Sequence, residues 1–405
     1  MAKKTRPVNH YSRGLFHRLA GASVGLVISA LLVIGLTVSE SLPTAQVKIS
    51  RFSFTHSSSD SFPVLPPTVS YGVSVPALHL EYSPTNTPVP IASITKMMTA
   101  YVALRSVKAS DQASKCHLVD STDVAAYEHE VATGQSTAFI QEGESICFPD
   151  LMRGLMVHSA SDYALILSRM FAPSTAQFVA KMNAEAKRLA MTNTVYSDPT
   201  GIQASNTSTP RDQLVLTAKL MRYQLIRDAV RLPSIELPVA GRLNSFTPYA
   251  GMLNVIGVKS GRTDAAGGCD VMATQMTYRG KSYLALVAVF GARGGDLLKP
   301  AGDDALAISD AISSLIDTHR ISSHEIVGAI TWEGQTVHIV FSHPVQTHGW
   351  SFEKNPDWKV VMRRINSARS AGSVVGWIYG PKHVLVGELV TTASLKGPSL
   401  LQRML

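Results

Sequence analysis

The sequence predicts an α/β body followed by a small all-β domain, and three observations carry this prediction. Between residues 90 and 230, apolar residues recur at spacings of three and four, which is typical of amphipathic helices. Between residues 252 and 292, three apolar segments of strand length are separated by glycine-containing or charged turns. After about residue 322, short alternating segments replace the helical spacing. A chain of 405 residues is long enough for two such domains plus extensions.

The first 45 residues combine a basic segment with a hydrophobic run. Five Lys and Arg residues precede residues 19–38, which contain no charged side chain. As a helix this run would span about 30 Å, the thickness of the hydrocarbon core of a bilayer, and it exceeds the roughly 7 to 15 residues of a signal-peptide core. We therefore expect a retained membrane anchor with an extracytoplasmic domain behind it, because the positive flank stays inside. Small residues near Ser39 and Ala45 leave open a cleaved signal peptide and a secreted protein.

The segments behind the hydrophobic run divide by composition. Residues 46–70 are predicted to be a spacer, because Ser50 to Ser70 contains seven serines and three prolines. Residues 71–322 form the main domain. A strand-like segment at 71–83 is followed by helices expected over 90–104, 149–172, 175–191 and 209–226, strands over 252–261, 268–278 and 281–292, and a closing helix over 302–319. Residues 323–405 are the predicted β-rich domain.

The charge and the cysteines limit the surroundings of the chain. A formal charge of +8 suits a protein near an anionic surface, but no basic module with interleaved aromatic residues indicates nucleic acid. In an oxidising compartment one pair among Cys116, Cys147 and Cys269 could close. We favour Cys116 with Cys147, because both precede the serine pair at residue 159; three small buried apolar residues are the alternative.

Ser93 and Lys96 stand at the start of the helix predicted over residues 90–104. Residues three apart on a helix share a face, about 5 to 6 Å apart at Cβ, so the amine can reach the hydroxyl. Desolvation by neighbours such as Met97 would lower the pKa of the amine and let it act as a base. The spacing alone is weak evidence, because a chain of this length contains about one such pair by chance. A second copy, "SFEK" at residues 351–354, lies in the β-like tail and is interpreted as chance.

Two further segments follow this pair in order. "VHSASDYA" places Ser159 and Ser161 at a predicted helical turn, and "GVKSGRTDAAGG" ends a strand-like run with Lys259, Ser260 and Gly261. A cation, a hydroxyl and a glycine that lets the backbone approach a ligand are suited to binding an anion at the edge of a sheet.

The order Ser-x-x-Lys, Ser-x-Asn, Lys-Thr-Gly is the signature of penicillin-binding proteins and class A β-lactamases. With the flanks "PIASITKMMTAYVAL", "DLMRGLMVHSASDYA", "SDPTGI" and "IGVKSGRTDAAGGC", residues 85–320 resemble the serine-type D-alanyl-D-alanine carboxypeptidases, the low-mass penicillin-binding proteins of peptidase family S11. The resemblance implies an antiparallel sheet flanked by helices, as in the DD-peptidase and β-lactamase fold, and a β-rich domain behind it.

The resemblance also implies an acyl-enzyme route on the D-Ala-D-Ala end of a peptidoglycan pentapeptide, with β-lactams as inhibitors. Ser93 would attack the carbonyl between the two D-alanines, Lys96 would take its proton, and Ser159 would relay a proton to the leaving D-alanine. Lys259 and Ser260 would hold the carboxylate, and the backbone N–H groups of Ser93 and Arg262 would hold the oxyanion. The implied substrate-binding residues are Ser161, Lys259, Ser260, Gly261 and Arg262.

Two positions depart from the family pattern. Ser161 stands where the family usually has Asn, and a hydroxyl cannot donate two N–H bonds as an amide can, so the departure affects substrate positioning. Ser260 in place of Thr keeps the hydroxyl.

Two other functions are compatible with the same fold. A β-lactamase would need a carboxylate that activates the deacylating water, and no Glu-x-x-x-Asn pattern between the middle motif and Lys259 supplies one. A non-catalytic wall-binding relative is permitted by Ser161 and disfavoured by the intact Ser93 and Lys96. No metal or cofactor is expected, because no carboxylate or cysteine set accompanies the histidines at 338, 343 and 348.

Overall fold

The computed structural model describes residues 45–50, 61–332, 334–353 and 358–397, in two compact units. The α/β unit comprises residues 55–318 and 348–354, and the β unit comprises residues 1–54, 319–347 and 355–405. The predicted basic segment and anchor helix lie outside the described residues. Within the described part of the chain, every helix is too short or too polar to cross a bilayer.

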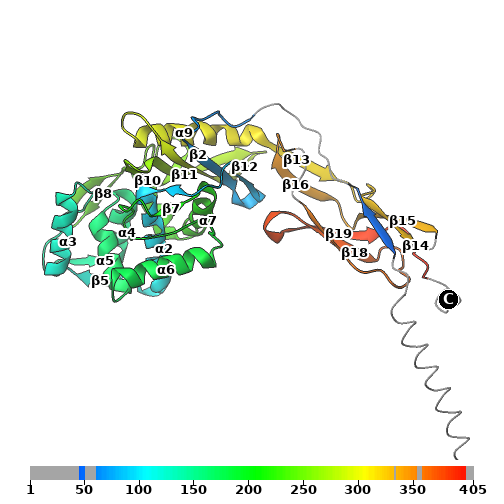
Figure 1. The fold of residues 1–405 in the computed structure, drawn as a ribbon, viewed down its shortest axis with the longest axis horizontal. Helices are drawn as coiled ribbons and strands as arrows, with labels where there is room; N and C mark the ends of the chain where they lie inside the picture. The colour runs from blue at the N-terminus through cyan, green and yellow to red at the C-terminus, as the bar shows by residue number, and fades with distance from the viewer. Residues whose placement is uncertain (1–44, 51–60, 333, 354–357, 398–405) are drawn as a thin grey trace, which may run out of the picture. The chain divides into compact units, whose positions relative to one another are not determined.

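A five-stranded antiparallel sheet forms the centre of the α/β unit, in the order β10-β11-β12-β2-β3. Alternation along β11 buries both faces of the sheet: Met272 and Met276 pack with Ile308 of α9, while Val271 and Ala273 pack with the helical part of the unit. Figure 1 shows α9 along one face and the other helices across the opposite face. The predicted antiparallel sheet flanked by helices is confirmed. The strand bounds are β2 Ser70–Val75, β3 Leu80–Tyr82, β10 Val255–Thr263, β11 Gly267–Tyr278 and β12 Lys281–Ala292.

The helices of this unit begin where the sequence supplies caps. Asp120 makes a capping box with Asp123 at the start of α3, Ser174 caps α6, and Thr209 caps α7 in front of a proline. The α-helices are α2 Lys96–Ser106, α3 Ser121–Ala132, α4 Phe148–Val157, α5 Ser161–Phe171, α6 Thr175–Arg188, α7 Pro210–Leu220, α8 Gln224–Val230 and α9 Leu298–Ala311. Short two-stranded pairs join them: β4 Val89–Pro90 with β7 Thr207–Ser208, β5 Cys116–Leu118 with β6 Ser145–Cys147, and β8 Ser234–Leu237 with β9 Gly241–Asn244.

Three predicted helices differ from the structure. The helix predicted over 209–226 is two helices, α7 and α8, because the chain turns at residues 221–223. The helix predicted over 149–172 is broken between α4 and α5, because Ser159 adopts a φ of 63° in the left-handed region, which no helix interior accommodates. The closing helix predicted over 302–319 ends at Ala311, continues as the 3-10 helix η4 (Ile312–Leu315) and then extends into β13 (Ile316–Ile321).

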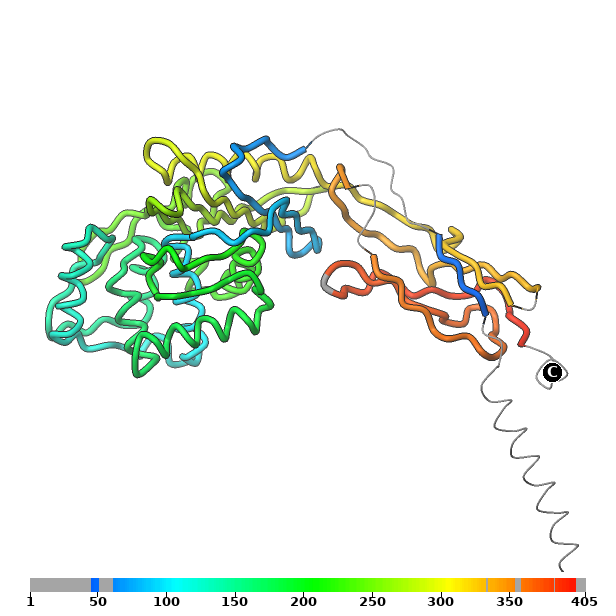
Figure 2. The backbone as a smooth tube through the Cα atoms, in the orientation of Figure 1, coloured from blue at the N-terminus to red at the C-terminus, as the bar shows by residue number. Residues whose placement is uncertain are grey.

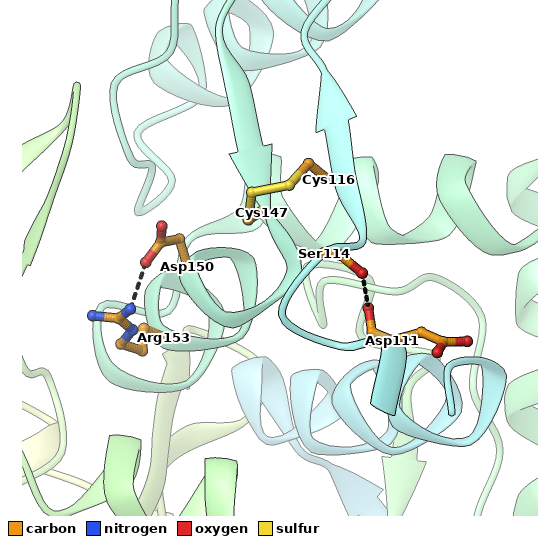
Figure 3. The surroundings of a disulfide bond; sticks show 6 residues. All are labelled: Asp111, Ser114, Cys116, Cys147, Asp150 and Arg153. Carbon is orange, nitrogen blue, oxygen red and sulfur yellow. Dashed lines mark hydrogen bonds and ion pairs between the residues drawn. A yellow bond between two sulfur atoms is a disulfide. The ribbon is translucent and has the colours of Figure 1, made fainter. Parts of the chain in front are cut away.

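A disulfide joins Cys116 to Cys147, which stand opposite each other in the β5–β6 pair (Figure 3). Cys269 is free and buried. The preferred cysteine pairing is therefore confirmed.

The β unit is built on a six-stranded sheet in the order β1-β14-β15-β19-β18-β17. Its core includes Ile330, Ile339, Phe341, Ile378 and Leu389. The predicted β-rich character of this region is confirmed. Its strands are β1 Gln46–Ile49, β14 Gly328–Trp332, β15 Gln335–Phe341, β17 Lys359–Met362, β18 Val374–Tyr379 and β19 Leu385–Thr391, and β13 pairs with β16 Val345–Trp350 in a separate two-stranded ribbon.

Strand β1 comes from the segment predicted as a spacer. It pairs antiparallel with β14, from Gln46 opposite Thr331 to Ile49 opposite Gly328. Figure 2 shows its blue trace beside the orange strands, although about 280 residues separate them in the sequence. Val47 and Ile49 pack against the core of the β unit. The four residues thus belong to the β sheet, and burial of their alternate side chains explains why.

Candidate active site

Ser93 and Lys96 meet at the junction of two helical segments. Ser93 lies in the 3-10 helix η2 (Ala92–Thr95), and Lys96 begins α2 directly after it. Ala92 has a φ of 46°, so a tight left-handed turn precedes the serine. The Nζ of Lys96 lies 3.0 Å from the Oγ of Ser93. Ser93 is half-buried and Lys96 is 1% exposed, so a polar ligand can reach the hydroxyl while the amine stays shielded from water.

A loop more than 100 residues away holds the amine in place. The Nζ of Lys96 donates to the carbonyl of Thr200 at 2.8 Å, and the hydroxyl of Thr99 donates to the carbonyl of Pro199 at 2.6 Å. Asp198 organises this loop by accepting five hydrogen bonds of 2.5 to 2.9 Å. The donors are the backbone N–H groups of Thr200, Gly201 and Gln203, the hydroxyl of Thr200 and the Nδ2 of Asn206.

The same loop packs directly against the serine turn. Gly201 has a φ of 88°, and a Cβ at this position would collide with the carbonyl of Ala92. Only glycine combines this backbone conformation with so close an approach. The turn before Ser93 and the loop after Asp198 therefore form one rigid support.

Burial sets the electrostatics of Lys96. Desolvation lowers its pKa from 10.5 to about 8, although the carboxylates of Asp198, Glu130 and Asp162 each favour the charged amine. Glu130 and Asp162 are themselves buried, and burial raises the pKa of both, that of Asp162 to about 7. An amine with a pKa near 8 can exchange a proton with Ser93 close to neutral pH.

Strand β10 brings the third motif to the serine. A Cβ added to Gly261 would lie 2.5 Å from the backbone nitrogen of Ser93, so the absence of a side chain lets the strand pass beside that N–H. Lys259 is fully buried, and its Nζ donates to the carbonyl of Ser260 at 2.6 Å. The Ser260 hydroxyl donates to the carbonyl of Phe246 at 2.8 Å. The exposed Arg262 side chain pairs with Asp296 at 3.0 Å.

The middle motif lies in the break between α4 and α5. Ser159 occupies the left-handed position of this break and is 4% exposed. Ser161 is buried at the first position of α5, and its backbone N–H donates to the carbonyl of Ser136 at 2.8 Å. Phe246 ties this break to β10: its N–H donates to the carbonyl of Val157 at 3.2 Å, and its carbonyl accepts the Ser260 hydroxyl.

Comparison with known proteins identifies the family. A model of the D-alanyl-D-alanine carboxypeptidase family, peptidase family S11, matches residues 80–293, more than half of the chain. The chain belongs to peptidase family S11. Solved structures agree in fold: the Streptomyces K15 DD-transpeptidase superposes with a TM-score of 0.54 at 22% identity, covering 62% of this chain and 98% of that one. The carboxypeptidase DacD from Francisella tularensis gives a TM-score of 0.59 at 17% identity, covering 81% and 94%.

Curated relatives of this S11 peptidase match over part of their length. DacF of Bacillus subtilis is 28% identical over 212 residues, which cover 50% of this chain and 51% of DacF. DacC of Escherichia coli is 30% identical over 183 residues, which cover 44% and 45%. A D-alanyl-D-alanine endopeptidase of Pseudomonas aeruginosa is 30% identical over 212 residues, covering 50% and 64%. The chain thus spans about half the length of the first two relatives.

In this member of family S11, Lys96 and the third motif lie beside Ser93, and Phe246 links the third motif to the break that holds the middle motif. In the second serine–lysine pair, Ser351 lies in a turn after β16, and Lys354 falls outside the described residues. The sequence predicts an ordinary turn at Asp198, and it assigns no role to the carboxyl groups that act electrostatically on the two lysines: Glu130, Asp162 and Asp270. Across the parts of the chain that the structure describes, three or more His, Cys, Asp or Glu side chains do not gather as a metal site would require.

Among the three carboxyl groups, Asp270 could have been found most easily from the sequence, because it is the one charged residue in the predicted strand at 268–278. On β11 it stands opposite Ser260 in the register and is fully buried. Neither of its carboxyl oxygens has a hydrogen-bond partner among the described residues. Burial lowers the pKa of Lys259 well below its usual value and Lys96 acts in the same direction, whereas Asp270 opposes both. Asp270 is therefore the nearby carboxyl group that favours a charged Lys259. Burial raises the pKa of Asp270 itself well above its usual value, and Lys259 opposes this effect.

Replacing Asp270 by Asn is expected to weaken recognition of carboxylate ligands as the pH rises. Without the opposing carboxylate the pKa of Lys259 falls further, so the alkaline limb of the pH profile for penicillin acylation should move to lower pH. The profile is measured as the second-order acylation rate between pH 6 and 10.

The matched control is Thr274→Val, which removes a buried 2.7 Å hydrogen bond to Ser309 from the same strand. It should leave the alkaline limb in place. An unshifted limb in the Asp270→Asn variant would show that this carboxyl group does not act on Lys259.

Proposed function

We propose that the α/β unit is a serine DD-carboxypeptidase, which removes the terminal D-alanine from peptidoglycan stem pentapeptides and is acylated by penicillins. The observation that carries the proposal is the buried amine of Lys96 at 3.0 Å from the half-buried hydroxyl of Ser93. The names of the curated relatives support the same reaction class.

The proposed reaction has two steps. The Oγ of Ser93 attacks the carbonyl carbon between the two D-alanines while Lys96 takes its proton, and the C–N bond breaks as the leaving amine receives a proton through Ser159. Water then attacks the resulting ester, and Ser93 recovers its proton as the shortened peptide leaves. The buried position of Lys96 supports its role as base, because the neutral amine is accessible near pH 8.

Strand β10 would hold the substrate in this reaction. The backbone N–H of Ser93 lies beside Gly261, and we propose it and the N–H of Arg262 as the oxyanion donors. Lys259 and Ser260 would bind the terminal carboxylate. Ser161, buried at the start of α5, is proposed to contact the peptide in place of the usual amide, with fewer donors.

We further propose that the α/β unit works outside the cytoplasm, tethered by residues 19–38. The Cys116–Cys147 disulfide supports export, because such bonds persist in oxidising compartments. The uncharged run of twenty residues supports a tether, because its length matches a membrane-spanning helix.

Mass spectrometry of the intact full-length chain with labelled penicillin tests the assigned activity. We expect one covalent adduct, which Ser93→Ala abolishes and Ser351→Ala retains, because Ser351 belongs to the second Ser-x-x-Lys copy. Release of D-alanine from a pentapeptide should follow the same pattern. Rapid turnover of the drug without a stable adduct would indicate a β-lactamase instead, and a folded protein that forms no adduct would contradict both enzymes.

A further inference from the structure

We propose that one end of the β unit is a docking surface for anionic lipid headgroups of the membrane. This surface, called the basic end below, is formed by Arg363, Arg364, Arg369 and Lys396. The proposal rests on the proposed export and tether, and it adds a role for the β unit that the carboxypeptidase reaction does not require.

The positive charge of the chain is concentrated in the β unit. Without the predicted basic segment and anchor at residues 1–44, the β unit (residues 45–54, 319–347 and 355–405) contains ten Lys and Arg against four Asp and Glu, a net charge of +6. The α/β unit, residues 55–318 and 348–354, contains 22 Lys and Arg against 24 Asp and Glu, a net charge of −2. The net positive charge therefore marks the β unit and not the unit that holds the serine and lysine motifs.

Hydrogen bonds bring the first part of the basic end to the point where the chain enters the β unit. Ala45 directly precedes β1, and its N–H donates to the carbonyl of Ile365 at 3.2 Å. Arg363 and Arg364 immediately precede Ile365, and both side chains are exposed. The entry point of the chain and this arginine pair are thus neighbours.

A second strip of chain adds the other two cations to the same end. Arg369 and Leu395 exchange backbone hydrogen bonds of 2.9 and 2.7 Å. Lys396 follows Leu395, is exposed, and donates its backbone N–H to the Oε1 of Gln335 at 3.0 Å. Gln335 is the first residue of β15 and pairs with Trp332 at the end of β14. The first residue of β1, Gln46, pairs with Thr331 at this same end of β14.

The described acidic side chains of the β unit lie elsewhere. Glu325 precedes the opposite end of β14, where Ser50 bonds to Val327. Glu388 stands in the middle of β19, where its Oε1 accepts from the indole of Trp377 at 3.3 Å. Glu333, the remaining acidic residue of residues 319–347, lies outside the described residues. The guanidinium of Arg363 stacks 4.7 Å from the centre of the Trp377 ring, whose indole bonds to Glu388. Arg363 is therefore the member of the basic end on the side of Glu388.

The proposed tether at residues 19–38 would place lipid headgroups within reach of the basic end. Seven residues separate the uncharged run at 19–38 from Gln46. At 3.3 to 3.6 Å per residue they reach at most about 25 Å, in whatever conformation. The chain enters the β unit at the basic end, so a run held in the bilayer keeps that end close to the headgroups. Guanidinium and ammonium groups bind phosphate oxygens, and their attraction to a charged surface decays within about 10 Å at 0.1 M salt.

A fluorescence experiment on the full chain tests the docking. Cys269 is buried and the other two cysteines are bonded to each other, so an environment-sensitive label can be placed at Ala368→Cys, an exposed site between Arg364 and Arg369. The protein is reconstituted in vesicles that carry a headgroup-linked quencher, either with phosphatidylglycerol or with phosphatidylcholine alone. We expect quenching in the anionic vesicles to be at least about twice that in the zwitterionic ones, and to decline as salt is raised.

Neutralising the basic end should remove this difference. The variant R363Q/R364Q/R369Q/K396Q is compared with K108Q/K115Q/K187Q/K219Q, which removes four exposed lysines of the α/β unit. If the first variant misfolds, R364Q/K396Q changes only exposed side chains and should still reduce the quenching by about half. Persistence of the full difference in either folded variant overturns the proposal.

Further outcomes separate the alternatives. Equal quenching in the two vesicle types overturns lipid docking. A fluorescence change of the label with soluble polyphosphate, but not with anionic vesicles, overturns it as well. Flotation tests the tether separately, because a membrane-spanning tether would bind the chain to both vesicle types. A chain that floats only with anionic vesicles has no such tether, but its binding still supports docking through the basic end. The penicillin adduct, measured on the same samples, reports the proposed enzyme separately.

Discussion

Replacing Lys96 by Met is expected to lower the rate of penicillin acylation about a thousandfold, the usual range for the loss of a positioned general base. Methionine keeps an unbranched side chain of similar length in a site that is 1% exposed, so the helix should pack as before. What disappears is the amine 3.0 Å from the Ser93 hydroxyl. The rate is measured by stopped-flow or by mass spectrometry at timed intervals.

The pH dependence gives this prediction a second readout. In the wild-type protein the acylation rate should rise with pH through about 8, because the neutral amine is the base and burial lowers the pKa of Lys96 to about 8. The stability should change in the same range. Between pH 8 and 10.5 the unfolded chain holds a proton on this lysine that the folded chain has lost, so the free energy of unfolding rises with pH by up to about 3 kcal/mol. Lys96→Met should lack this contribution.

The control for this variant is Lys219→Met, an exposed lysine on α7, which should change neither the rate nor the pH profile. A wild-type rate that stays flat from pH 7 to 9, or a variant that keeps more than about a tenth of the rate, would exclude Lys96 as the base.

Replacing Asp198 by Ala should lower the acylation rate about a hundredfold and the free energy of unfolding by about 3 kcal/mol. The carboxylate accepts five hydrogen bonds that shape the loop carrying the Thr200 carbonyl, and this carbonyl accepts from Lys96. Without it, the buried donors are unsatisfied and the amine loses its fixed position. The bonds also oppose the effect of burial and hold the pKa of Asp198 below its usual value. Its contribution to stability is therefore present at neutral pH and lost as the pH falls through the acidic range.

A matched variant separates positioning from stability. Asp212 is a second buried carboxylate of the α/β unit, which accepts from the N–H of Asn193 at 2.9 Å and the hydroxyl of Thr194 at 2.7 Å. Asp212→Ala should also destabilise the fold, as urea unfolding measures, while folded protein keeps the wild-type acylation rate. If Asp198→Ala behaves like Asp212→Ala, the loop has no positioning role.

Features of local origin were accessible from the sequence. Ser93 and Lys96 are three residues apart, so their proximity depends on one turn of backbone, and the order of the three motifs is written along the chain. Apolar spacing indicated the strands of the central sheet and most helices, since burial of one face imposes that period. The break at Ser159 could not be predicted in this way, because the apolar spacing continues across it and a single left-handed residue leaves no trace in periodicity.

By itself, then, the sequence determined the family, the sheet-forming segments and the residues of the three motifs. Only the tertiary structure decided what surrounds them: the Asp198 loop against Lys96, the buried Asp270 beside the third motif, and β1 in a sheet with strands from the far end of the chain. The physical reason is that local backbone geometry depends on neighbours in sequence, whereas desolvation and long-range hydrogen bonds depend on elements that meet only when the chain has folded.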